Sequence, residues 1–318
     1  MIPKIRSICR NIAKDPKKII SYSLLVVGPV LPDKLYLQVK WWSVTGRTLN
    51  LRSPQGFNEK IQWLKLYNRR SEYTALADKY EVRKYVKKTI GEEYLLPLLG
   101  VWERAEDIDF KQLPDQFVLK CTHNSGGGMC LCKDKKQLNI PRVVQALNTA
   151  LKKNFYRQFR EWVYKDIPPR IIAEPFLIDR DSSNKLGTLI DYKFYCFNGE
   201  PKFLYVGADD VSQGKKGELA LSVLDLDWKP APFGRADHQP LAQAVDKPKQ
   251  FEQMVMLARK LSRGIPFVRV DLYWVNGQIL FSEMTFYPGA GYGLFSPLEW
   301  EHKIGKWLAL PTGTNHER

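Results

Sequence analysis

The chain has 318 residues, of which 44% are hydrophobic and 26% are charged. These values are typical of a soluble globular protein and exclude a wholly disordered chain, and the length is sufficient for two or three subdomains. The net charge is +15, and residues 1–52, with ten basic and two acidic side chains, contribute +8 of it. This imbalance favours an anionic partner such as nucleic acid, acidic lipid or an anionic substrate, although a solvated basic face explains it equally well.

Residues 1–52 are predicted to form a basic N-terminal arm. Its apolar run from Ile19 to Leu31 is interrupted by Gly28-Pro29. The run is shorter than the ~20 apolar residues that span a bilayer, and no small-residue cleavage site follows it. The five cysteines lack the spacing of a disulfide framework, which favours a reducing compartment. We therefore expect a cytoplasmic protein, and the arm leaves open a peripheral contact with the anionic inner membrane.

The next region, residues 53–115, is predicted to be mainly helical. Apolar side chains recur at helical spacing over residues 57–67 and again over residues 73–86. Beyond this region, short runs rich in Val, Ile, Phe and Tyr alternate with turns that contain Gly or Pro. Two helices, near residues 141–154 and 247–263, interrupt these predicted strands.

These elements predict an α+β protein whose larger part is built on antiparallel strands. We divide that part into one subdomain at residues 116–178, which carries a glycine-rich loop, and another at residues 179–318, which carries a candidate metal site. Four segments within the two subdomains contain residues suited to chemistry.

The first segment is a strand, a glycine-rich loop and a second strand between Phe117 and Cys132. The backbone amides of such a loop are able to close over phosphate oxygens, and Lys120 at the end of the first strand would place an ammonium beside them. Because a strand follows the loop, it is neither a Walker loop nor a Rossmann turn. A loop that merely reverses the chain is the ordinary alternative. The loop residues of interest are Thr122, Ser125, Gly126, Gly127 and Gly128.

The same segment contains three cysteines and a histidine, residue types that commonly bind zinc. One residue separates Cys121 from His123, and one separates Cys130 from Cys132, whereas zinc ribbons and fingers use two to four. We therefore favour small buried side chains over a structural zinc site.

The second and third segments are strands with an acidic or basic residue at a notable position. Residues 170–177 form an apolar strand that runs into Glu174-Pro175, where backbone groups and a carboxylate meet at a hinge. Residues 191–197 form a strand joined by Asn198-Gly199 to a partner strand, a strong hairpin signal. Lys193 in the middle of that strand either has an anionic partner or faces solvent.

The fourth segment is the most informative. Two apolar strands over residues 267–286 are joined by Asn276-Gly277, which predicts a hairpin. Arg269 and Asp271 share a face of the first strand, and Glu283 and Thr285 share a face of the second. Carboxylates that face each other across a hairpin repel unless a cation lies between them, and oxygen ligands with nucleotide phosphates suit magnesium. The alternative is that Arg269 simply pairs with one of the two carboxylates.

Taken together, these motifs resemble the TupA-like ATP-grasp family, which occurs among bacterial surface-polysaccharide genes. The resemblance covers about Phe57 to Leu308. It implies an ATP-grasp fold, with the nucleotide held between two antiparallel-sheet subdomains. The residues that carry it are Arg269-x-Asp271, Glu283-x-Thr285 followed by Pro288-Gly289, Lys120 with its loop, Glu174, Pro201 and the stretches FNEKIQWL at 57–64 and ADKYEVR at 77–83.

The resemblance also implies a role for each matching residue. Lys120 and the loop residues Thr122 and Ser125 to Gly128 would contact the phosphates of ATP, and Glu174 would hold the adenosine. Asp271 and Glu283 would bind magnesium, with Thr285 as a third ligand where many ATP-grasp enzymes have asparagine. Two residues would be catalytic: Lys193 would neutralise the γ-phosphate, and Arg269 would stabilise the transferring phosphoryl group and the acyl phosphate.

The implied activity is an ATP- and magnesium-dependent carboxylate–amine ligase that acts through an acyl phosphate. Its implied substrates are an amino acid or other amine and a uronic acid or related carboxylated sugar. The main alternative is a glycosyltransferase with Asp225-Leu226-Asp227 as a metal motif for a nucleotide sugar. We do not expect a nucleic-acid partner, because no recognition motif accompanies the basic charge. A protein that binds ATP without turnover also stays open.

Overall fold

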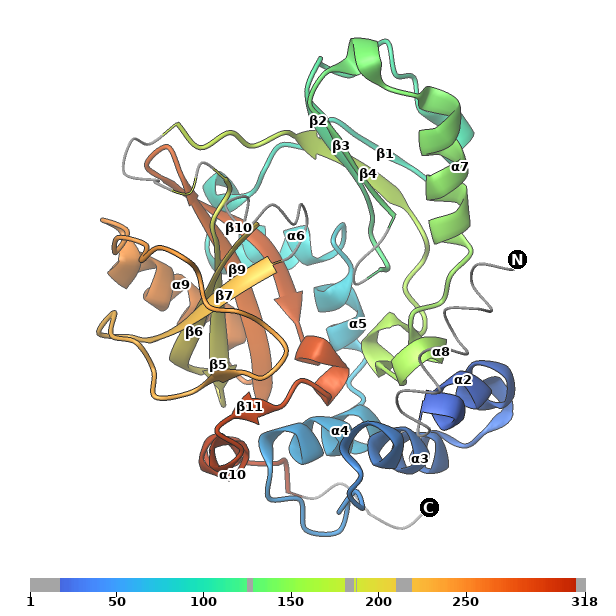
Figure 1. Ribbon diagram of the computed structural model, residues 1–318. Coiled ribbons are helices and arrows are strands. Elements are labelled where there is room, and N and C mark those ends of the chain that lie inside the picture. The colour runs from blue at the N-terminus through green and yellow to red at the C-terminus, as the bar shows by residue number, and fades with distance from the viewer. Residues whose placement is uncertain (1–17, 125–127, 181–185, 187, 210–218, 313–318) are drawn as a thin grey trace.

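The computed structural model describes residues 18–124, 128–180, 186, 188–209 and 219–312 (Figure 1). Its helices are α2 (Lys18–Val27), α3 (Asp33–Thr45), α4 (Phe57–Tyr67), α5 (Glu72–Ala77), α6 (Val82–Thr89), α7 (Ile140–Leu151), α8 (Tyr156–Phe159), α9 (Phe251–Ser262) and α10 (Glu299–Gly305). Its strands are β1 (Gly100–Trp102), β2 (Phe117–Cys121), β3 (Met129–Cys132), β4 (Ile171–Pro175), β5 (Asp191–Phe197), β6 (Glu200–Asp209), β7 (Leu219–Asp225), β8 (Gly234–Arg235), β9 (Phe267–Val275), β10 (Gln278–Thr285) and β11 (Phe295–Ser296).

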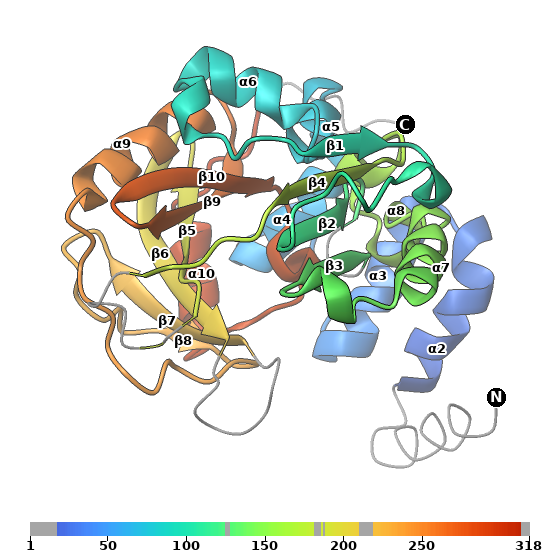
Figure 2. The ribbon, with the colours of Figure 1, turned by 90° about the horizontal axis from the view of Figure 1, so that it is seen from above.

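Two antiparallel sheets dominate the fold, as the α+β prediction requires. A four-stranded sheet has the order β1-β4-β2-β3, and a five-stranded sheet has the order β10-β9-β5-β6-β7. The two sheets lie side by side with separate helices against them (Figures 1 and 2). Strand β1 comes from the region that was predicted to be mainly helical, and it pairs with β4.

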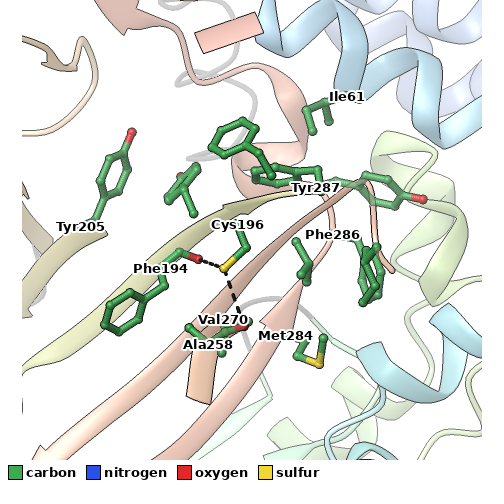
Figure 3. Close-up of a cluster of buried hydrophobic side chains, with 14 of the residues drawn as sticks. Ile61, Phe194, Cys196, Tyr205, Ala258, Val270, Met284, Phe286 and Tyr287 are labelled. Atoms are coloured by element: carbon green, nitrogen blue, oxygen red, sulfur yellow. Dashed lines mark hydrogen bonds between the residues drawn. The ribbon is translucent and has the colours of Figure 1, made fainter. Parts of the chain in front are cut away.

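Each sheet has its own apolar core. In the four-stranded sheet, Phe117 and Ile171 pack with Leu147 and Ala150 of α7. In the five-stranded sheet, α9 covers one face, and Cys196 of β5 lies beside the carbonyl oxygens of Phe194 and Ala258 (Figure 3). Because α9 buries only one face, the alternate residues of β5 and β9 are directed to the other face.

The predicted helix over residues 73–86 is wrong in one respect, because the structure divides it into α5 and α6. The break is at Asp78, whose backbone is extended with φ −74° and ψ 118°. The Asp78 carboxylate is buried, accepts a hydrogen bond from the Tyr80 amide at 2.9 Å and lies 3.6 Å from Arg170. An aspartate that bonds to a nearby amide competes with the helix. The apolar periodicity continues across Asp78, so the sequence pattern did not predict that the helix breaks there.

The other predicted helices and both Asn-Gly hairpins are confirmed. Asn198 and Gly199 have φ 51° and 84°, and Asn276 and Gly277 have φ 51° and 79°. Positive φ at both central residues is the two-residue hairpin geometry that Asn-Gly favours.

The part of the arm that the structure describes forms two helices. Helix α3 packs into the protein through Tyr36, Leu37 and Trp41, which are buried. At the start of α3, Asp33 forms an ion pair with Arg160, and the Asp33 Oδ1 lies 2.9 Å from the Arg160 Nε. Among the described residues, no helix is long and apolar enough to cross a membrane.

Candidate functional site

A cavity of about 550 Å³ lies between the two sheets. Ligand pockets of small molecules are commonly of this size. Its four-stranded wall includes Met129 and Leu131 of β3, large apolar side chains that are 57% and 52% exposed. Residues 174–179, at the end of β4 and beyond it, and Asp191, Gly207 and Tyr273 of the five-stranded sheet also line the cavity. The cavity therefore has an apolar side at β3 and charged groups at its borders.

Lys120 and Glu174 meet at the border of this cavity. They lie on adjacent antiparallel strands, and the Lys120 Nζ is 2.8 Å from the Glu174 Oε2. Arg83 of α6 approaches the other carboxylate oxygen of Glu174 at 3.8 Å. The side chains of Lys120 and Glu174 are 21% and 10% exposed, so the pair is largely removed from water. The structure thus joins the predicted phosphate-contacting lysine to the predicted adenosine-binding glutamate.

The glycine-rich loop is described only at its ends. Ser125, Gly126 and Gly127 lie outside the described residues. Gly128 has φ 66°, and a Cβ there would lie 2.6 Å from the Cβ of Ala150, so glycine is required for both backbone and packing reasons. Thr122 is fully buried and does not line the cavity.

The charged residues of the fourth segment converge on one face of the five-stranded sheet. Asp271 of β9 is paired in register with Glu283 of β10 and with Lys193 of β5. Arg269 binds Asp271 through two hydrogen bonds of 2.7 and 2.6 Å, and its Nη2 also reaches Glu283 at 3.2 Å and Thr285 at 3.1 Å. Arg269 therefore pairs with both carboxylates, whereas the sequence left open a pairing with one of them.

Lys193 is buried with two anionic partners. Its Nζ lies 2.8 Å from Asp191 and 3.1 Å from Asp271, and only 8% of the residue is exposed. Burial acts to lower the pKa of the Lys193 ammonium, but the Asp271 and Asp191 carboxylates outweigh it and raise that pKa above its ordinary value. Lys193 is thus a buried, charged lysine and does not face solvent.

Glu283 is the more accessible of the two paired carboxylates. Asp271 is fully buried, whereas a third of the Glu283 side chain is exposed. Burial acts to raise the pKa of Glu283, but Lys79, Arg269 and Lys193 outweigh it and lower the pKa to about 2. Glu283 is therefore ionised throughout the neutral range.

Two basic residues of this site were not among the predicted site residues. Lys79, just after α5, lies 3.7 Å from the Glu283 Oε2 and donates a hydrogen bond of 2.7 Å to the Asn124 carbonyl oxygen at the glycine-rich loop. Arg83 approaches Glu174. Both fall in the 77–83 stretch that carried the family resemblance, but no periodicity or spacing indicated that they reach the two sheets.

The donors at Asp271, Glu283 and Thr285 fit magnesium in their chemistry. Magnesium is commonly held by one or two carboxylates together with substrate phosphates and water. Both Asp271 oxygens already accept hydrogen bonds from Arg269, whereas among the described residues the Glu283 Oε2 has one charged partner, Lys79 at 3.7 Å. Within the described ranges, no group of three or more His, Cys, Asp or Glu side chains is arranged so that it could hold a metal ion by itself. A metal here would depend on oxygens from a bound nucleotide.

The cysteines of the zinc interpretation and the aspartates of the Asp225-Leu226-Asp227 motif contribute to the fold and, among the described residues, do not form metal sites. Cys121 and Cys132 are buried in the core of the four-stranded sheet, and Cys130 packs against that core. Asp225 accepts hydrogen bonds from the backbone amides of Asp227 and Lys229 at 3.0 and 2.8 Å, which closes the turn after β7. Neither Asp225 nor Asp227 lines the cavity.

None of the curated proteins matches the chain. Among solved structures, it is similar to D-alanine–D-alanine ligase from Helicobacter pylori, with 15% identity and a TM-score of 0.41 over 74% of this chain and 61% of that one. It is similar to L-amino acid ligase from Bacillus licheniformis, with 13% identity and a TM-score of 0.42 over 74% of this chain and 49% of that one.

A third similar structure is D-alanine–D-alanine ligase from Bacillus anthracis complexed with ATP, with 13% identity and a TM-score of 0.37 over 67% of this chain and 54% of that one. The chain thus spans less than two thirds of the length of each of these three proteins. The family model of the TupA-like ATP-grasp proteins matches residues 59–309. Because this match spans most of the sequence, the chain belongs to the TupA-like ATP-grasp family.

Proposed function

We propose that this protein is an ATP- and magnesium-dependent ligase that joins a carboxylate to an amine through an acyl phosphate. The observation that carries the proposal is that charged residues of both sheets lie at the cavity and continue from it to the hairpin. Lys120 and Asp191 line the cavity on the two sheets, and Lys193 lies 2.8 Å from Asp191 and 3.1 Å from Asp271, which Arg269 joins to Glu283. Cations at and beside a cavity suit a triphosphate, whose charge grows on the leaving group during transfer.

In this proposal Glu283 and Asp271 would hold magnesium together with the phosphates, and the Thr285 hydroxyl would be a third ligand. The ion would supply neutralisation of phosphate charge. The Thr285 hydroxyl lies 3.3 Å from the Glu283 Oε1 and 3.1 Å from Arg269, so it already orients both groups. Asp271 would share its oxygens with Arg269 and Lys193.

The reaction has two balanced steps. A carboxylate oxygen of the substrate attacks the γ-phosphorus of ATP, a new C–O–P linkage forms, and the bond to the β-phosphate oxygen breaks to release ADP. The amine nitrogen then attacks the acyl carbon, a C–N bond forms, and inorganic phosphate leaves as the nitrogen loses a proton. Arg269 and Lys193 would neutralise the phosphoryl oxygens in the first step, and positioning by the two sheets supplies much of the rate.

The proposed substrates are a uronic acid or related carboxylated sugar and an amino acid or other amine. The basic surplus of the chain is compatible with an anionic substrate. The glycosyltransferase alternative lacks comparable support, because Asp225 is occupied by the turn after β7.

The test is magnesium-dependent phosphate release with a panel of uronic acids and amino acids. We expect release that requires both substrates and falls at least about 100-fold in Asp271→Asn and Glu283→Gln. Asp227→Asn, an acid-to-amide change at an exposed turn position, is the matched control and should behave as the wild type. The ligase proposal would be contradicted if the protein did not bind ATP but turned over a nucleotide sugar, and if Asp227→Asn abolished that turnover.

We also propose that the arm contacts anionic membranes in the cytoplasm. Large apolar side chains on and between α2 and α3 are exposed, with Val30 at 83%. Among the side chains described in this region, the exposed set is Ile19, Val27, Val30, Leu35, Trp42 and Val44. The wild-type protein should co-sediment with vesicles that contain about one third phosphatidylserine, and the bound fraction should be smaller at high salt than at low salt. Val30→Asp should lower the bound fraction. Equal sedimentation with neutral vesicles would argue against the electrostatic part of this contact.

A further inference from the structure

Asp78 is a buried aspartate that joins helices α5 and α6. It is 1% exposed, and its backbone is extended. Its amide donates to the Thr74 carbonyl oxygen of α5 at 3.1 Å, and its carbonyl oxygen accepts from the Val82 amide of α6 at 3.0 Å. Its carboxylate accepts from the Tyr80 amide at 2.9 Å. An extended residue whose side-chain oxygen bonds to the amide two residues later has the geometry of a helix N-cap. Asp78 therefore ends one helix and begins the next.

Lys79, the residue after the break, contacts parts of both sheets. Its amide donates to the carbonyl oxygen of Thr122, just beyond β2, at 3.3 Å. Its Nζ donates to the Asn124 carbonyl oxygen at 2.7 Å and lies 3.7 Å from the Glu283 Oε2 on β10. The Lys79 side chain is 18% exposed, and an ammonium that is largely removed from water requires polar partners. Lys79 thus links the start of the glycine-rich loop to the carboxylate pair of the hairpin.

Arg170, the residue before β4, holds the break against the four-stranded sheet. Its Nη1 lies 3.6 Å from the Asp78 Oδ2 and 2.9 Å from the Glu81 Oε1. Its guanidinium lies over the Tyr80 ring, 5.0 Å from the ring centroid. Its carbonyl oxygen accepts from the Thr122 amide at 2.9 Å. One arginine therefore contacts Asp78, Tyr80 and Glu81 on both sides of Lys79, and it is bonded to the segment that leads into the glycine-rich loop.

The break also sets where α6 places Arg83. The Arg83 Nη1 lies 3.8 Å from the Glu174 Oε1, and its Nη2 donates to the Leu96 carbonyl oxygen at 2.6 Å. In one uninterrupted helix over residues 73–86, a single helical period would fix the directions of Lys79 and Arg83 together. The break removes that constraint, so that Lys79 reaches Glu283 on one sheet and Arg83 reaches Glu174 on the other.

The place of the break in the fold suits such a role. Helices α5 and α6 lie beside the region in which the two sheets approach each other (Figures 1 and 2). A small polar cavity in this region is lined by Lys79 and Arg83 together with Lys120, Glu174 and Ser282. The cavity thus brings the two cations from the α5–α6 segment beside the lysine and the glutamate that line the larger nucleotide cavity.

We propose that Asp78 and Arg170 are positioning residues that hold Lys79 between Asn124 and Glu283. This inference rests on the proposed function, because it assigns to these two residues an effect on nucleotide binding. Neither of them lines the nucleotide cavity. They act through Lys79, which brings a positive charge to the site of an anionic ligand. Loss of Asp78 or Arg170 should therefore weaken nucleotide binding only while Lys79 is present.

The test is a double-mutant cycle in the full-length protein, with the Kd of a non-hydrolysable ATP analogue and magnesium measured by calorimetry. Asp78→Ala and Lys79→Met should each raise the Kd about tenfold. The double variant should bind within about twofold of Lys79→Met alone, because Asp78 acts through Lys79. Arg170→Gln leaves Asp78 in place and should give the same result with Lys79→Met, so it decides the question if Asp78→Ala does not fold.

Two further variants separate positioning from general loss of folding. Asp78→Asn keeps an acceptor for the Tyr80 amide and should bind within about threefold of the wild type. Asp109→Ala is the matched control, because the exposed Asp109 carboxylate makes the same kind of bond, to the Lys111 amide at 3.0 Å, and lies outside the cavity lining. Its Kd should equal that of the wild type.

The inference would be overturned if the effects of Asp78→Ala and Lys79→Met multiplied to about 100-fold in the double variant, because Asp78 would then act independently of Lys79. An unchanged Kd in either single variant would overturn it as well. A wild type that binds the analogue but shows no turnover with any substrate pair would contradict the ligase proposal alone, since the binding cycle still decides the role of Asp78.

Discussion

Glu283 lies directly opposite Asp271 because Ser282 is an extra residue in β10. The pairing proceeds regularly from the Asn276-Gly277 turn to Phe281, which faces Leu272, and then shifts so that Glu283 faces Asp271. In a regular hairpin Ser282 would occupy that position. The bulge therefore places two carboxylates across from each other, and Arg269 bridges them.

The first prediction concerns the pH dependence that Glu283 contributes to stability. Its pKa of about 2 in the folded protein is below the ordinary value of 4.5, so its ionised form stabilises the fold. This contribution is complete above about pH 4.5 and is lost as the pH falls towards 2. The difference in free energy of unfolding between the wild type and Glu283→Gln should therefore be larger at pH 6 than at pH 3, as urea titrations would measure. A difference that is constant with pH would mean that the charges around Glu283 do not stabilise it.

A second prediction concerns the buried Lys65 of α4. Lys65 and Glu161 are both almost fully buried, and burial raises the pKa of Glu161 despite the nearby Lys65. Lys65→Met removes three hydrogen bonds and a cation near Glu161, so we expect a loss of about 2–4 kcal/mol in the free energy of unfolding.

The double variant Lys65→Met with Glu161→Gln should recover part of that loss, because no ionisable carboxyl then stays buried without the nearby cation. Lys303→Met removes a lysine from an exposed pair with Glu299 and should change stability by less than about 0.5 kcal/mol. A double variant no more stable than Lys65→Met would show that the lost hydrogen bonds, and not the charge, set the cost.

The third prediction concerns the contact of α10 with the chain before α4. A Cβ at Gly305 would overlap the backbone carbonyl oxygen of Gln55, which no side-chain rotation relieves. Gly305→Ala should therefore destabilise the protein by about 1–3 kcal/mol in denaturant unfolding. Gly234→Ala is the control, because a Cβ there would have no atom within 4 Å. Equal stability of the two variants would exclude this close approach in solution.

The fourth prediction concerns nucleotide affinity. Lys120 lines the cavity and holds Glu174 at 2.8 Å. Lys120→Met should raise the Kd of a non-hydrolysable ATP analogue at least about tenfold in calorimetry, because a charged hydrogen-bond donor is lost. Lys136→Met, at an exposed position beyond β3, should leave the Kd unchanged. An unchanged Kd in Lys120→Met would remove this residue from the proposed phosphate contacts.

Local patterns were sufficient for the strands and the hairpins, but not for the position of Glu283, which the bulge at Ser282 brings opposite Asp271. Asn-Gly turns require positive φ at both positions, and period two along a strand places Arg269 and Asp271 on one face. The charged segment of each sheet could therefore be predicted, including Lys193 in the middle of β5. The break at Asp78 could not, because it depends on burial beside Arg170, which is distant in sequence.

The two antiparallel hairpins, the glycine-rich loop after Lys120 and the family motifs could be predicted, because each depends on residues that are close along the chain. Which distant charges meet became clear in the folded protein alone. Lys79 reaches Glu283, Arg83 reaches Glu174, and Gln62 reaches Gly291, each across 90 residues or more of chain. Such contacts depend on how separate elements pack, and periodicity within one element carries no information about its neighbour.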